Sequence, residues 1–92
     1  MRIQKNLAAL NERINRAREE LRIVEEQILF QMDVVEETKT RAVVSETPLA
    51  HREHEEARAD YDRMLKERER IVRSIAELQT EQDRLLDRML KA

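Results

Sequence analysis

The sequence predicts an all-α fold, an antiparallel two-helix coiled-coil hairpin that dimerises into a four-helix bundle. Three observations carry this prediction: apolar residues recur in heptads through both halves of the chain, the only proline separates the two halves, and glycine and cysteine are absent. Charged residues make up 41% of the chain and hydrophobic residues 40%, a balance typical of coiled coils rather than of disorder. We therefore expect residues 1–92 to form a single helical hairpin.

The first helix is predicted over about residues 2–44. Apolar residues recur there at alternating steps of four and three, which keeps them on one face of a helix. The seam positions of this helix are Ile3, Leu7, Leu10, Ile14, Ala17, Leu21, Val24, Ile28, Gln31, Val35, Thr38 and Ala42.

A turn is predicted at residues 45–47, followed by a second helix over about residues 48–91. Proline is favoured in the first turn of a helix and forces the preceding residue out of the α conformation, so Thr47 is expected to cap a helix that begins at Pro48. The seam positions of the second helix are Ala50, His54, Ala57, Tyr61, Met64, Arg68, Ile71, Ile75, Leu78, Gln82, Leu85 and Met89.

Folding the chain about this turn brings the two seams face to face in a constant register. The numbers of every facing pair add up to 92, from Ala42 with Ala50 to Leu7 with Leu85. A parallel dimer of one continuous helix is the competing arrangement, and Pro48 disfavours it because proline inside a helix costs about 3 kcal/mol. The register places Gln31 opposite Tyr61, whose hydroxyl could bind its amide, and Thr38 opposite His54. It also brings Arg41 to Glu53 and Arg13 to Glu81 as pairs of opposite charge.

Apolar residues outside the seam indicate where a second copy of the chain would bind. Leu29 and Met32 of the first helix and Leu65 and Val72 of the second widen the seam on one flank. An apolar strip beside a two-helix seam commonly packs against another helix pair. We expect self-association through these four residues; the alternative is that they are scattered surface side chains, which are common.

Two further surfaces are candidates for binding another protein. Ile23, Phe30 and Val34 line one stripe of the first helix on the opposite flank. The predicted tip of the hairpin carries the second set, which consists of Val44, Ser45, Glu46 and Leu49, beside Val43.

The sequence gives no sign of catalytic, metal or cofactor chemistry. A chain without glycine or cysteine has neither a phosphate-binding loop nor a thiolate site. His51, His54 and Glu55 lie within one helical turn, but neither histidine follows a glutamate three residues earlier, as the di-iron bundles require. We expect no enzyme activity, no metal and no cofactor.

The predicted function is therefore that of a scaffold, adaptor or regulator that binds proteins. The 18 basic and 20 acidic residues are interspersed, which argues against nucleic acid as the main partner, and no apolar run is long enough to span a membrane. The absence of cysteine and the excess of arginine over lysine indicate a cytoplasmic, bacterial protein.

An alternative function is a regulator that inserts its tip into a larger enzyme such as RNA polymerase. A long hairpin with an exposed tip resembles, in architecture only, the bacterial transcript-cleavage factors of the Gre type. Their tips cluster carboxylates to hold a metal ion, whereas the predicted turn here contains Glu46 alone.

Overall fold

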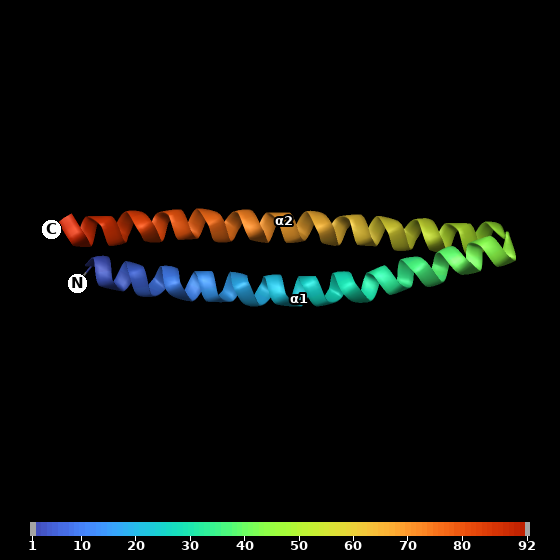
Figure 1. The fold of residues 1–92 in the computed structure, drawn as a ribbon, viewed down its shortest axis with the longest axis horizontal. Helices are drawn as coiled ribbons and strands as arrows, with labels where there is room; N and C mark the ends of the chain where they lie inside the picture. The colour runs from blue at the N-terminus through green and yellow to red at the C-terminus, as the bar shows by residue number, and fades with distance from the viewer. Residues whose placement is uncertain (1, 92) are drawn as a thin grey trace. The chain divides into compact units, whose positions relative to one another are not determined.

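The computed structural model describes residues 2–91, which fold into two long α-helices (Figure 1). Helix α1 spans Arg2–Ser45 and helix α2 spans Pro48–Lys91. The all-helical class predicted from the heptads is confirmed. The helix limits lie within a residue of the predicted ones, and Ser45, which was expected in the turn, is the last residue of α1.

The turn consists of Glu46 and Thr47, and each of them caps one helix. Glu46 has a φ of 53°, and its N–H donates to the carbonyl oxygen of Ala42 at 3.0 Å. A left-handed residue with this single hydrogen bond is the αL motif that ends many helices. The Thr47 hydroxyl accepts a hydrogen bond from the N–H of Ala50 at 3.1 Å, so the predicted N-cap of α2 is confirmed.

The contacts divide the chain into two compact units, each containing a segment of both helices. One unit is Ile23–Arg68, and the other combines residues 2–22 with residues 69–91. The assignment of residues 1–92 to a single domain stays a prediction, and residues 1 and 92 lie outside the described part of the chain.

The unit Ile23–Arg68 is a helical hairpin around the turn. The Gln31 amide donates to the carbonyl oxygen of Ala57 at 3.0 Å, and the Thr38 hydroxyl lies 3.3 Å from Nδ1 of His54. Thr38 follows Gln31 in α1, whereas its partner His54 precedes Ala57 in α2, so the two segments run antiparallel. The buried side chains of this unit all occupy predicted seam positions; they are Ile28, Gln31, Thr38, Ala42, Ala50 and Ala57.

The unit formed by residues 2–22 and 69–91 is an antiparallel helix pair with a larger share of big aliphatic side chains. Leu10, Ile14 and Leu78 form its buried cluster, and Leu85 packs against them. Ala17 and Ile71 are buried as well, so every buried side chain here also lies on the predicted seam. A cross-helix hydrogen bond from the Gln82 amide to the Asn11 side chain agrees with the predicted register to within one residue.

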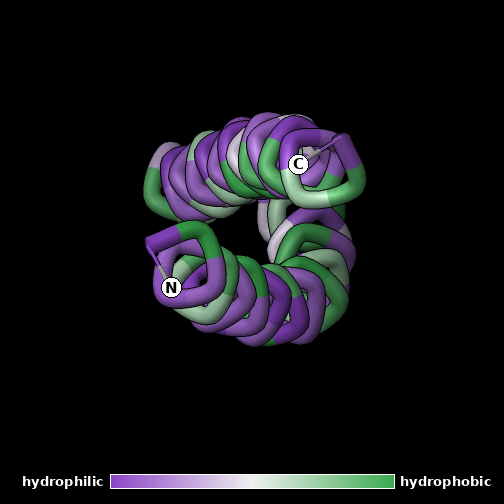
Figure 2. The backbone as a smooth tube through the Cα atoms, turned by 90° about the vertical axis from the view of Figure 1, so that its left-hand side faces the viewer, coloured by the Kyte–Doolittle hydropathy of each residue, from purple (hydrophilic) through white to green (hydrophobic). Residues whose placement is uncertain are grey.

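Hydrophobic and hydrophilic residues alternate in bands along the backbone of both helices (Figure 2). The bands are the heptad pattern seen in space, since a residue returns to the same side of a helix after about seven positions. A helix pair with one buried seam leaves most of each helix surface in solvent, so the apolar side chains outside the seam are the ones that need a functional explanation.

Candidate protein-binding surfaces

A groove in the unit Ile23–Arg68 brings together three of the four residues predicted for self-association. Leu29 and Met32 of α1 and Leu65 of α2 line it, with Tyr61 also in its wall. The Leu29 side chain is 65% exposed and the Met32 side chain 46% exposed, whereas Leu65 is half-buried. We call the surface made by Leu29, Met32 and Leu65 the groove face. It presents apolar carbon from both helices to solvent.

The heptad explains why these side chains converge. Leu29 directly follows the buried seam residue Ile28, and Leu65 directly follows the seam residue Met64, so both point outward on the same side of the seam. Met32 adds to this side one helical turn after Leu29. The groove continues past Met32 into a hollow lined by Val35, Glu36 and Tyr61 as well.

The fourth predicted residue, Val72, belongs to the other unit. Its side chain is 48% exposed, and it does not line the groove. Self-association through the four residues together stays a prediction.

The opposite flank brings two of its three predicted residues together. Ile23 and Phe30 line a second groove, whose floor includes Gln31 and Met64. The Phe30 ring is 71% exposed, while Val34 is half-buried and does not line this groove. An aromatic ring of this exposure is a suitable anchor for a partner, because burying it would remove a large apolar area from water.

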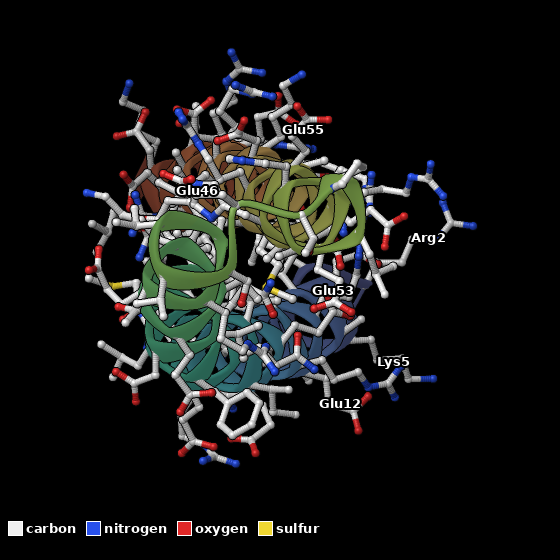
Figure 3. All side chains as sticks on the ribbon, turned by 90° about the vertical axis from the view of Figure 1, so that its right-hand side faces the viewer. Arg2, Lys5, Glu12, Glu46, Glu53 and Glu55 are labelled. Atoms are coloured by element: carbon white, nitrogen blue, oxygen red, sulfur yellow. The ribbon has the colours of Figure 1, made fainter. Side chains whose placement is uncertain are left out.

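The tip exposes three large aliphatic side chains around the turn. Val43 and Leu49 are more than half exposed, and Val44 is 78% exposed. The view onto this end in Figure 3 shows Glu46 at the junction of the two helices. Ser45 and Glu46 are exposed beside them, so the predicted tip surface is accessible in the chain.

Of the two polar seam contacts expected across the helices, the one of Gln31 differs from the prediction and the one of Thr38 agrees with it. The Gln31 amide bonds the backbone oxygen of Ala57 rather than the Tyr61 hydroxyl. The Thr38 hydroxyl does contact His54, as predicted, and also donates within its own helix to the carbonyl of Val34. The carbonyl oxygen of Ala57 already satisfies the hydrogen-bonding need of the buried amide, so a bond to the Tyr61 hydroxyl is not required.

Neither of the two predicted cross-helix ion pairs, Arg41 with Glu53 and Arg13 with Glu81, lies within 4 Å among the described side chains. A cross-helix pair instead joins Arg70 to Glu20 at 4.0 Å. Such side chains are long and solvated, so the register alone does not determine which opposite charge each of them contacts.

Within α1, ion pairs link neighbouring turns. Glu12 pairs with Arg16, four residues later, at 3.8 Å. The hydrogen bond from Arg22 lowers the pKa of the Glu19 carboxyl below its ordinary value, and the positive charge of Arg22 adds to this shift.

Two exposed leucines were not singled out from the sequence. Leu86 is 43% exposed and Leu90 is 87% exposed, and both belong to the unit that contains residues 69–91. Leu86 stands at the same heptad position as Leu65 and Val72, and this spacing in multiples of seven could have identified it from the sequence.

The histidines do not contribute to a metal site in the described residues. His51 is exposed, His54 contacts Thr38, and no group of three histidine or acidic side chains within residues 2–91 could hold a metal ion. Neither α1 nor α2 contains an apolar stretch sufficient to cross a membrane in the part that the structure describes. No protein-family model, curated protein or solved structure matches the chain.

Proposed function

We propose that this protein is a non-catalytic protein–protein interaction module that forms a homodimer through the groove face and binds a further protein through its other flank or its tip. The groove face is the observation that carries the proposal. Leu29 and Met32 stand exposed beside Leu65 of the neighbouring helix, and a second helix pair would cover all three. Four helices around one apolar centre would exclude water from residues that a two-helix pair leaves wet.

The oligomeric state of the purified chain tests this proposal. Light scattering coupled to size exclusion, at concentrations on the order of tens of micromolar, should report a dimer with a dissociation constant in the micromolar range. Replacing Leu29 with Glu should shift the chain to monomer, because a charge would have to be buried against apolar carbon. Circular dichroism of the variant should still show full helicity, since Leu29 is exposed in the single chain.

Phe30→Glu is the matched control. Phe30 neighbours Leu29 in sequence and is just as exposed, but it lines the groove on the opposite flank. The Phe30→Glu variant should remain dimeric. A wild-type chain that stays monomeric at these concentrations would contradict the proposal, and a dimer lost only in Phe30→Glu would move the contact to the other flank.

The turn supports a second candidate function, in which the tip enters a cleft of a larger enzyme such as RNA polymerase. Val44 and Leu49 are exposed on the two sides of Glu46, whose left-handed backbone is costly for a residue with a Cβ. Changing both Val44 and Leu49 to Ser keeps the caps and removes the apolar contact. The double variant should then lose binding to the purified enzyme at unchanged helicity, and wild-type chain that does not bind the enzyme would rule this function out.

A further inference from the structure

Charged side chains border the groove face in an ordered pattern. Glu25 of α1 and Arg68 of α2 line one end of the groove. Glu36 lines the adjoining hollow beyond Met32. Arg58 stands seven residues before Leu65 on α2, so it lies on the same stripe of that helix. The apolar centre therefore has an acidic and a basic residue on each side of it.

The register places the opposite charges at nearly the same height along the hairpin. Facing residues have numbers that add up to 92, as the contact of Thr38 with His54 shows. Glu25 therefore faces position 67, next to Arg68, and Glu36 faces position 56, two residues from Arg58. At a rise of about 1.5 Å per residue, each acidic residue lies within about 3 Å of the height of its basic counterpart.

These four charged side chains have no ion pair in the single chain. Among the described residues, Glu25, Glu36, Arg58 and Arg68 make no side-chain contact with an opposite charge within 4 Å, although such pairs form elsewhere, for example between Arg70 and Glu20. The matched charges are therefore available to a partner that covers the groove face.

We infer that the partner on the groove face is a second copy of this chain that points in the same direction, with a two-fold axis parallel to the helices. This inference rests on the proposed homodimer and adds its geometry. Such an axis lays α1 of one copy over α2 of the other at the same height. Leu29 then packs on the partner's Leu65, Glu25 meets the partner's Arg68, and Glu36 meets the partner's Arg58. By symmetry, each contact forms twice.

The opposite direction does not fit the same surface. A two-fold axis perpendicular to the helices lays α1 over α1 of the other copy with the heights reversed. Centred between Leu29 and Met32, this arrangement brings Glu25 against the partner's Glu36, and the same contact between like charges occurs twice. It also sets Leu65 against the partner's Arg58. Like charges facing each other weaken association, so the charge pattern selects the same-direction dimer.

Charge reversal at Glu36 separates the two directions. In the same-direction dimer, Glu36→Arg would face the partner's Arg58 in both symmetry-related contacts, and the dimer should weaken about tenfold because two exposed ion pairs become repulsive. Arg58→Glu should weaken it by a similar factor. An equimolar mixture of the two variants should recover wild-type affinity, because both contacts in the mixed dimer again join opposite charges. Sedimentation equilibrium measures all three dissociation constants.

Asp33→Arg is the matched control for Glu36→Arg. The Asp33→Arg substitution changes the charge by the same amount on the same helix. Asp33 is exposed and points away from the seam at an outer heptad position. The Asp33→Arg variant should dimerise like the wild type. Circular dichroism should report equal helicity for all the variants, since none of the altered charges is paired in the single chain.

The outcomes distinguish this inference from the proposed function. A wild-type monomer overturns both. A wild-type dimer that is unaffected by Glu36→Arg, or that tightens with it, overturns the same-direction geometry and leaves self-association standing. Two weakened variants that fail to restore each other on mixing also overturn the geometry, because the charges at positions 36 and 58 would then not face each other across the dimer.

Discussion

Replacing Glu46 with Gly should stabilise the protein. Glu46 has a φ of 53°, in the left-handed region, where a Cβ atom crowds the backbone at a cost of about 1–2 kcal/mol. Glycine removes this crowding, but its freer unfolded chain offsets roughly 0.5–1 kcal/mol of the gain. The hydrogen bond from the N–H of residue 46 to Ala42 is a backbone bond and is retained. The net gain should be about 0.5–1 kcal/mol, which for a chain of this length raises the Tm by about 3–6 °C.

Urea unfolding followed by circular dichroism, at one fixed protein concentration, measures the change in free energy of unfolding. Glu46→Ala serves as the control, because it removes the carboxylate but keeps the Cβ atom in the left-handed conformation. The glycine variant should exceed the alanine variant by about 1 kcal/mol. Equal stability of the two variants would refute the reasoning, since it would mean that the cost of the positive φ does not exceed the entropy that glycine adds to the unfolded chain.

Three further changes test other contacts. Thr47→Ala removes the cap of α2 and should lower the free energy of unfolding by about 1 kcal/mol, whereas Thr47→Ser should change it little; urea unfolding measures both. Gln31→Leu should raise stability by about 1 kcal/mol, because it adds buried apolar area and the carbonyl of Ala57 keeps its helical hydrogen bond; a loss of stability in the same assay would show that the amide bond outweighs the burial. The hydrogen bond from Arg22 holds the pKa of Glu19 below its ordinary value, so this contact stabilises the fold above that ordinary pKa and its contribution is lost as the pH falls through the folded-state pKa. Carboxyl NMR titration should show this pKa rising back toward its ordinary value in Arg22→Ala.

The helices and their register could be predicted from the sequence because several signals agree. The step of three and four marks the seam, and Pro48 with Thr47 marks the start of the second helix. Burial follows the seam so closely that Met89 is the exposed exception among its positions, at 39%. Met89 stands in the last turn of α2, where few neighbours remain to cover it.

Other features could not be predicted because the pattern does not encode them. The left-handed conformation of Glu46 has no glycine or asparagine to announce it. The Gln31 amide donates to a backbone oxygen, and every residue has such an acceptor, so the sequence does not indicate which one is used. Heptad positions did place Leu29, Met32 and Leu65 on one surface, but Val72, which has the same heptad position as Leu65, lies outside this groove.

The two-residue turn also sets the order in which contacts can form as the chain folds. Across the helices, Thr38 and His54 are 16 residues apart in sequence, Gln31 and Ala57 are 26 apart, and Asn11 and Gln82 are 71 apart. The entropy lost in closing a loop grows with its length, so contacts beside the turn form at the lowest cost.

Folding should therefore start at the turn and proceed like a zipper toward the chain ends. Substitutions beside Thr38 should slow refolding, whereas substitutions near Leu78 should mainly accelerate unfolding. The capped turn that ends one helix and begins the next thereby also acts as the nucleus from which the pairing grows.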